Sequence, residues 1–160
     1  MSRAPGRPAG ATARPGKGRF VAYWLPAVAY VALIFIVSSI RGGDLPSPVP
    51  NLDKLAHLLE YSLLGLLLGR AIRFTLGGRG RAAAVGLTIA AGAVVGALDE
   101  IYQRGVPGRS SDVRDWAVDV AAVAFSVLLA QWVSDRSLRG RGGAANGDES
   151  TAASNEKGTR

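Results

Sequence analysis

The sequence predicts an all-α integral membrane protein, a compact bundle of four transmembrane helices with disordered cytoplasmic tails. The first observation behind this prediction is a set of uncharged runs, at residues 20–40, 82–98 and 120–134. A helix that crosses the hydrocarbon core of a bilayer needs about 20 apolar residues, and these runs approach or reach that length. The second observation is that 48% of the 160 residues are hydrophobic, although both ends of the chain are polar.

Both ends of the chain are rich in Pro, Gly, Ala and charged residues and hold too few apolar residues to pack. We therefore predict a disordered basic tail at residues 1–19, a transmembrane domain at 20–134 and a second disordered tail at 135–160. The first uncharged run is too long for a signal-peptide core and lacks a small-residue cleavage site, so it is expected to remain as an anchor.

Four helices are expected within the transmembrane domain, at about Phe20–Ser38, Asp53–Phe74, Arg81–Gln103 and Asp112–Val133. The second carries a leucine run, and the third is rich in Ala and Gly. The three connections are short and contain Gly or Pro, the residues that end helices. Consecutive spans are therefore expected to run in opposite directions.

The Lys and Arg residues are unevenly distributed between the two sides of this bundle. Five lie in the N-terminal tail, four around the loop between spans two and three, and five in the C-terminal tail. The other side has five, near the remaining two loops. Because cytoplasmic segments carry the excess of Lys and Arg, both termini are expected in the cytoplasm of a multi-pass cell-membrane protein.

Charge and cysteine content exclude several classes of protein. The chain contains no cysteine, which rules out disulfides, thiolate zinc sites and cysteine nucleophiles. Its net charge is +7, from 19 Lys and Arg against 12 Asp and Glu. Since the basic residues flank the apolar runs, we interpret the charge as a topology signal and expect no nucleic-acid partner.

The third span contains Gly92 and Gly96, a G-x-x-x-G pair that lets two helix backbones approach closely in lipid. Packing against another span of the same chain is the first interpretation of this pair. A homo-oligomer formed through Gly92 and Gly96 is the second.

Charged and polar residues gather at the extracytoplasmic end of the bundle. They come from the end of span one, the start of span two, the end of span three and the start of span four. Helical spacing puts them on shared helix faces: Asp53, His57 and Glu60; Asp99 and Gln103; Asp112, Asp115 and Asp119. Carboxylates at this depth are costly in lipid and should face the bundle interior or a wet cavity, so their convergence favours a functional pocket.

Each of these residues also has a purely structural interpretation. Asp53 suits the N-terminal end of a helix as a cap, and a lone histidine such as His57 is often only a hydrogen-bonding residue. Arg109 with Asp112 or Asp115 would tie the outer loop to span four. Aromatic side chains are common anchors at the membrane interface, which applies to Tyr61, Tyr102 and Trp116.

Several segments at this end resemble the VanZ-like family: DKLAHLLEY at 53–61, DEIYQ at 99–103, PGR at 107–109, and Asp115 with Asp119. The serine pair Ser38 and Ser39 at the end of span one fits as well. The resemblance covers about residues 23–133, nearly the whole chain apart from its tails. One departure is that Ala121 and Ala122 follow the last aspartate, where the family often has a glycine.

The resemblance implies a small bacterial membrane protein with several spans. The member that gives the family its name is linked to low-level resistance to teicoplanin, a glycopeptide antibiotic, and the resemblance implies no particular reaction. It implies binding residues at the positions that match the family pattern: Asp53, Lys54, His57, Tyr61, Asp99, Glu100, Gln103, Arg109, Asp115 and Asp119.

Three functions from different classes are compatible with this pocket. The first is binding or modulation of a membrane lipid or of a lipid-linked or glycopeptide-related envelope component, because arginine suits phosphate and carboxylates suit sugar hydroxyls. The second is an intramembrane enzyme acting on a lipid-linked phosphate or sugar, with His57 as a base oriented by Glu60 or Asp115. The third is an oligomeric transporter in which Glu60 carries the proton or cation.

No cofactor is expected and no metal ligands are assigned, since no catalytic or metal-binding sequence motif is present. The oxygen-rich set with His57 leaves a metal-dependent form of the enzyme open, with Mg²⁺ or Mn²⁺.

If the pocket exists, His57 should lie within about 12 Å of Asp115, roughly a helix diameter. Buried carboxylates also need a cation, so Arg109 is expected to pair with one of four acids: Asp99, Glu100, Asp112 or Asp115.

Overall fold

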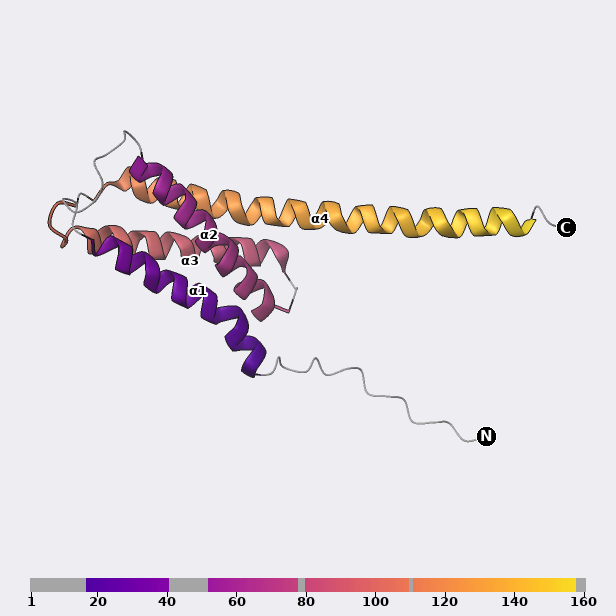
Figure 1. Ribbon diagram of the computed structural model, residues 1–160, viewed down its shortest axis with the longest axis horizontal. Coiled ribbons are helices and arrows are strands. Elements are labelled where there is room, and N and C mark those ends of the chain that lie inside the picture. The colour runs from indigo at the N-terminus through magenta and orange to yellow at the C-terminus, as the bar shows by residue number, and fades with distance from the viewer. Residues whose placement is uncertain (1–16, 41–51, 78–79, 110, 158–160) are drawn as a thin grey trace.

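The computed structural model describes the backbone of residues 17–40, 52–77, 80–109 and 111–157, and the side chains of all of these except 52–53 and 138–157. Four helices contain most of these residues (Figure 1). They are α1 Lys17–Ser38, α2 Leu52–Thr75, α3 Arg81–Gln103 and α4 Val113–Lys157. No strand occurs within the described ranges, and the predicted all-α fold is confirmed.

All four helices are long and apolar enough to cross a membrane, with the candidate spans Lys17–Ser38, Lys54–Thr75, Arg81–Gln103 and Val113–Ser137. Their outward faces carry many large apolar side chains, for example Leu25, Leu59 and Phe125, each more than 60% exposed. Lipid chains cover such a surface favourably, whereas in water a continuous surface of this kind would associate. The chain is therefore a multi-pass membrane protein.

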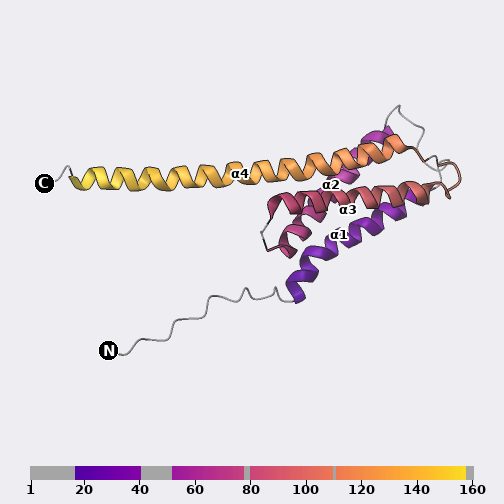
Figure 2. The same cartoon turned by 180° about the vertical axis from the view of Figure 1, so that it is seen from behind.

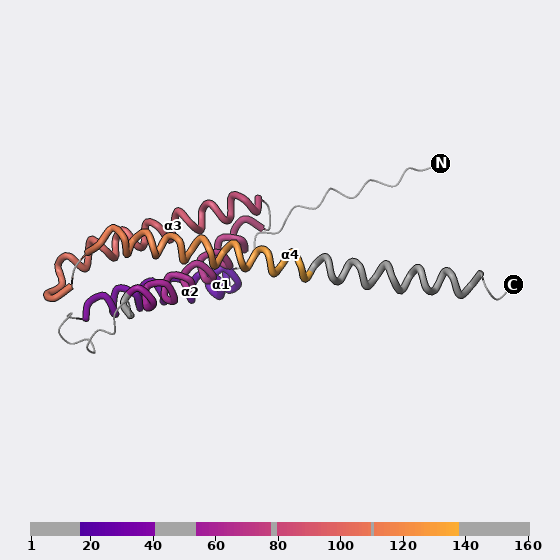
Figure 3. The backbone as a smooth tube through the Cα atoms, turned by 90° about the horizontal axis from the view of Figure 1, so that it is seen from above, coloured from indigo at the N-terminus to yellow at the C-terminus, as the bar shows by residue number. Residues whose placement is uncertain are grey.

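The two middle helices of the bundle are α2 and α3. α2 packs against each of the other three helices, and α3 also packs against α1 and α4, while the backbones of α1 and α4 do not approach each other closely within the described residues. Figures 1 and 2 show from two sides that the ends of α1 and α3 lie beside the starts of α2 and α4. Figure 3 shows α1 alongside α2 in the same bundle. The polar residues at these four helix ends therefore share one end of the molecule.

Small residues allow α4 to approach α2 and α3 closely. Val123 of α4 is fully buried and lies between Gly65 of α2 and Gly92 of α3. A Cβ atom added at Gly92 would lie 2.7 Å from a methyl carbon of Val123, and one added at Gly65 would lie 3.0 Å from the Val123 Cα. Gly96 faces Asp119 of α4 in the same way. The G-x-x-x-G pair thus packs two helices of one chain, and a homo-oligomer through the pair would have to displace this contact.

The C-terminal part of α4 differs from the sequence-based prediction. The sequence predicts a helix end near Val133, whereas α4 continues to Lys157 and extends well past the other helices (Figure 1). The physical reason is cooperativity, because the packed first part of α4 supplies the nucleus and each further residue adds one backbone hydrogen bond. The predicted N-terminal tail lies outside the described residues, except that residues 17–19 are the first of α1.

Candidate functional site

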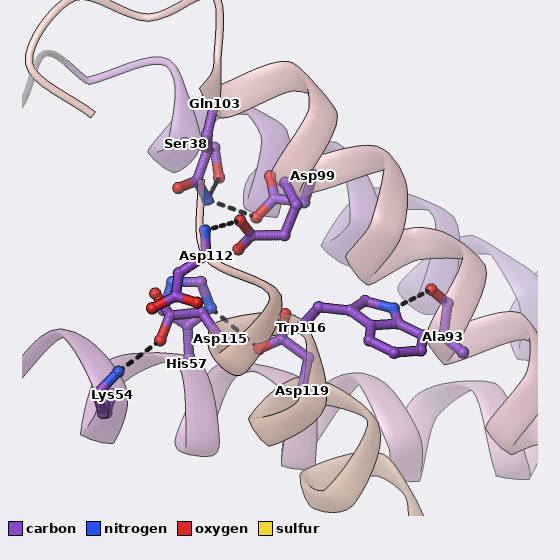
Figure 4. A network of polar contacts seen from close by, with 11 residues as sticks. Ser38, Lys54, His57, Ala93, Asp99, Gln103, Asp112, Asp115, Trp116 and Asp119 are labelled. Atoms are coloured by element: carbon purple, nitrogen blue, oxygen red, sulfur yellow. Dashed lines mark hydrogen bonds and ion pairs between the residues drawn. The ribbon is translucent and has the colours of Figure 1, made fainter. Parts of the chain in front are cut away.

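Polar side chains from all four helices meet at the end of the bundle where α1 and α3 finish and α2 and α4 begin (Figure 4). We call this group the polar cluster. It consists of Ser38 from α1, Lys54, His57 and Tyr61 from α2, Asp99, Glu100 and Gln103 from α3, and Asp115 and Asp119 from α4.

Two pairs of side chains connect α2 to α4. Lys54 Nζ lies 2.7 Å from Asp115 Oδ1, and His57 Nδ1 lies 3.0 Å from Asp119 Oδ1. The partners are three residues apart on α2 and four apart on α4, so the two pairs lie one helical turn apart. The Lys54 side chain is 41% exposed, whereas the Asp119 side chain is fully buried. The His57–Asp119 hydrogen bond is therefore in the less polar surroundings, where such a bond is electrostatically stronger.

A second set of hydrogen bonds connects α3 to α1. Gln103 Nε2 donates to Asp99 Oδ2 at 2.8 Å, one turn earlier on α3, and to Ser38 Oγ at 3.4 Å. All three residues are buried. Gln103 therefore orients the Asp99 carboxylate and holds the end of α1 against the end of α3.

Glu100 connects α3 to the first turn of α4. Its Oε2 accepts the backbone N–H of Asp112 at 2.9 Å, and Asp112 Oδ1 accepts the backbone N–H of Arg114 at 2.8 Å. Asp112 is thus the N-cap of α4, a position where aspartate is strongly preferred. The cap fixes where α4 begins, and the first two turns of the helix then carry Asp115 and Asp119 into the cluster.

Three buried polar atoms of the cluster have no hydrogen-bond partner among the described residues: the Tyr61 hydroxyl, Asp99 Oδ1 and Asp119 Oδ2. Tyr61 and Asp119 are completely buried. The Tyr61 ring stacks on the His57 imidazole, with 6.2 Å between the ring centroids. Buried polar atoms are costly unless a partner satisfies them, so these three atoms are the groups of the cluster for which the described residues supply no such partner.

The structure brings together most of the binding residues named from the sequence: Lys54, His57, Tyr61, Asp99, Glu100, Gln103, Asp115 and Asp119. The side chain of Asp53 lies outside the described residues. The hydrogen-bonding partner of His57 is Asp119, in place of the Glu60 or Asp115 expected from the sequence. Asp115 binds Lys54 instead, and the half-buried Glu60 makes no hydrogen bond within the described part of the chain.

Arg109 corrects a second expectation, because it pairs with none of the four acids proposed for it. Its Nε donates to the carbonyl oxygen of Ile40 and its terminal guanidinium nitrogen to that of Val37, both at 3.3 Å. These carbonyls lie in the last turn of α1 and just beyond it. The last carbonyl groups of a helix have no partner within the helix, and the negative end of the helix dipole attracts a cation. Arg109 therefore holds the loop before α4 against α1.

Arg109→Gln is expected to destabilise the protein by about 1–2 kcal/mol, because hydrogen bonds from a charged donor contribute about 1.5–3 kcal/mol and this donor is only half-buried. The measurement is thermal unfolding of the purified chain in detergent. Arg114→Gln is the matched control, since Arg114 is exposed at the same end and its side chain makes no hydrogen bond to any described residue. Equal effects of the two substitutions would contradict the role assigned to Arg109.

A cavity of about 220 Å³ lies beside the polar cluster, between the end of α3 and the start of α4. Glu100 of the cluster and Arg104 line it, together with Ile101, Val113 and Trp116. The two aliphatic residues are exposed on the outer surface of the bundle. The cavity is therefore lined by both charged and apolar side chains.

A larger cavity of about 390 Å³ lies at the opposite end of the bundle, between α1, α2 and α4. Tyr23, Arg70 and Phe74 are among the residues that line it. The Arg70 guanidinium lies 4.4 Å from the centre of the Tyr23 ring, which stacks on Phe74. In the sequence analysis, Arg70 serves only to predict which side of the membrane is cytoplasmic. A cavity between packed helices produces no recognisable pattern in the sequence.

Comparison with known protein families gives a match for this chain. The family model VanZ/LLP1 matches residues 17–134, a range that contains α1, α2, α3, the packed part of α4 and the whole polar cluster. Comparisons with curated proteins and with solved structures find no match.

Proposed function

Because the chain belongs to the VanZ/LLP1 family, we propose that it is a bacterial cell-membrane protein that binds or modulates a lipid-linked component of the cell envelope. The polar head of this component would occupy the 220 Å³ cavity beside the polar cluster. The excess of Lys and Arg in both tails supports cytoplasmic termini and hence an extracytoplasmic position for this cavity.

The observation that carries the proposal is the mixed charged and apolar lining of the cavity. Arg104 and Glu100 supply a cation and a carboxylate, whereas Ile101 and Val113 are aliphatic and 60% and 71% exposed. A ligand with a polar head and a hydrocarbon tail matches this lining, since its tail would remain among the lipid chains. A guanidinium group binds phosphate oxygens through two parallel hydrogen bonds, and a carboxylate accepts hydrogen bonds from sugar hydroxyls or amines.

The test is the lipid that the purified full-length protein retains in mild detergent, identified by extraction and mass spectrometry. We expect a retained anionic phospholipid or polyprenyl phosphate. Arg104→Met removes the charge and keeps an apolar side chain of similar reach. It is expected to lower the retained amount about tenfold or more, because hydrogen bonds to charged groups contribute about 1.5–3 kcal/mol.

Arg114→Met is the control for this experiment, because Arg114 is exposed at the same end of the bundle and does not line the cavity. It should leave the retained lipid within about twofold of the unsubstituted protein, as expected for a charge whose contacts are screened by solvent. The proposal fails if no anionic lipid is retained, or if the two arginine substitutions lower retention equally.

The buried His57–Asp119 pair favours a second candidate, an intramembrane enzyme acting on a lipid-linked phosphate or sugar. A carboxylate that holds one imidazole nitrogen leaves the other nitrogen positioned as a general base. Phosphate release from polyprenyl phosphates in liposomes separates the two functions. Release that is lost in His57→Gln while lipid retention persists supports the enzyme, and retention without release supports binding alone.

A further inference from the structure

We propose that His57, Glu100 and Asp119 form a binding site for one divalent transition-metal ion at the centre of the polar cluster. The proposal goes beyond binding of a lipid-linked component and does not depend on it, because it rests on three side chains of this chain. The three residues come from α2, α3 and α4 and follow no sequence motif, which explains why the sequence alone assigns no metal ligands.

The three side chains converge within the distances of one coordination sphere. One ring nitrogen of His57, one carboxylate oxygen of Glu100 and one of Asp119 all lie within 4.8 Å of one another. Metal bonds to nitrogen and oxygen are about 2.0–2.2 Å long, so two ligands of the same ion lie about 3–4 Å apart. The 3.0 Å between His57 Nδ1 and Asp119 Oδ1 already has this value. The Glu100 oxygen, within 4.8 Å of both other ligand atoms, would have to move closer to complete the set.

Unpartnered oxygen atoms beside these ligands give an independent indication that the site binds a cation. Asp119 Oδ2 and Asp99 Oδ1 have no hydrogen-bond partner within the described residues, although the exposed fractions of Asp119 and Asp99 are 0% and 1%. The buried Tyr61 hydroxyl is also unpartnered there. Neighbouring buried carboxylates repel one another and have lost their hydration, and a bound cation would offset both costs.

The charges of the cluster also favour a cation at this position. Asp99, Glu100 and Asp119 contribute three carboxylates, and the His57–Asp119 contact is the one ion pair that the described residues form with any of them. The amino group of Lys54 binds Asp115, one turn nearer to the start of α4. Of these three carboxylates, only Asp119 therefore has a basic side chain as its partner among the described residues.

The ligand set selects the kind of ion. Ca²⁺ and Mg²⁺ prefer sites made of oxygen alone, whereas an imidazole nitrogen with carboxylates suits Mn²⁺, Fe²⁺ or Zn²⁺. Metal binding requires a histidine nitrogen without its proton. The ion would therefore replace the proton that lies between His57 Nδ1 and Asp119 Oδ1.

Manganese(II) chloride is the probe for this site, because free Mn²⁺ can be measured directly by electron paramagnetic resonance. The full-length protein in detergent, first treated with EDTA, is expected to bind one Mn²⁺ per chain saturably. Glu100→Gln keeps an oxygen that can accept the Asp112 N–H, and Asp119→Asn keeps the shape of its side chain. Each is expected to raise the Mn²⁺ dissociation constant by at least about 100-fold. The loss of a residue that only supports a metal ligand already weakens binding by up to about 100-fold.

Asp115→Asn is the matched control, because it removes the same charge one turn away on α4. Its effect on the Mn²⁺ dissociation constant should stay below about threefold, since the Asp115 pair is partly exposed and screened. The spectrum of bound Mn²⁺ should also show coupling to a ¹⁴N nucleus, and His57→Gln should abolish it. Circular dichroism of each variant establishes that its helices are retained.

The proposal is overturned if the folded, unsubstituted protein binds no Mn²⁺ saturably or if the bound ion shows no nitrogen coupling. Neither of these measurements depends on the folding of a variant. Equal losses in Asp115→Asn and Asp119→Asn would overturn it as well, because attraction by general charge would then explain the binding. Failure to bind Mn²⁺ leaves the lipid-retention result unaffected, so the two proposals fail separately.

Discussion

Asp119→Ala is expected to lower the free energy of unfolding by about 3–5 kcal/mol, the range for removing one partner of a buried charged pair. Asp119 is completely buried, and its Oδ1 lies 3.0 Å from His57 Nδ1. Without the carboxylate, the imidazole loses its hydrogen-bond partner in a place that water does not readily reach. The measurement is thermal or denaturant unfolding of the purified chain in detergent, followed by the loss of helical circular dichroism.

A double-mutant cycle with His57→Ala isolates the interaction itself from the cavity that each truncation leaves. We expect a coupling energy of about 1–3 kcal/mol between His57 and Asp119, as for residues in direct contact. Lys54 and Asp115 provide the matched control, because they join the same two helices one turn away and their side chains are 41% and 15% exposed. Their coupling should stay below about 1 kcal/mol. Similar coupling energies for both pairs would show that burial does not strengthen the interaction between His57 and Asp119.

Gly65→Ala is expected to destabilise the bundle by about 1–3 kcal/mol, the usual cost of overpacking a close contact. The added Cβ would lie 3.0 Å from both the Cα and the carbonyl oxygen of Val123, which belong to the backbone of α4. It would also meet the Ser126 hydroxyl. A backbone cannot move aside as a side chain can, so α2 and α4 have to separate. A lowered unfolding midpoint in detergent measures this effect.

Gly86→Ala is the control for the glycine substitution. Gly86 lies within α3, and a Cβ added there meets nothing within 4 Å. Alanine should stabilise this helix by up to about 1 kcal/mol, since glycine is the poorer helix former. If Gly65→Ala raises the midpoint as Gly86→Ala does, α2 and α4 are not in the close contact described here.

The four spans and the location of the polar cluster follow from the sequence through one constraint. In a bilayer every backbone polar group needs a partner, so a long uncharged run has to form a helix that crosses the membrane. The third helix accordingly has the predicted bounds, Arg81–Gln103. Since consecutive spans run in opposite directions, the charged residues between spans one and two and between spans three and four must lie at the same end.

Which of these residues meet depends on the packing between helices. Helical periodicity places Asp115 and Asp119 on one face of α4, but it does not say how α4 is rotated or shifted against α2. The insertion of Val123 between Gly65 and Gly92 sets that position. As a result, His57 of α2 contacts Asp119, and Lys54 of α2 contacts Asp115.

The same limit applies to Arg109 and to the three proposed metal ligands. A nearby acid is the expected partner of an arginine when only the sequence is known, yet the loop before α4 brings Arg109 to backbone carbonyls at the end of α1 and just beyond it. The ligands His57, Glu100 and Asp119 come from three helices, so no spacing along the chain relates them. Periodicity and composition act along one helix, whereas these contacts depend on distances between helices, which arise only when the side chains pack.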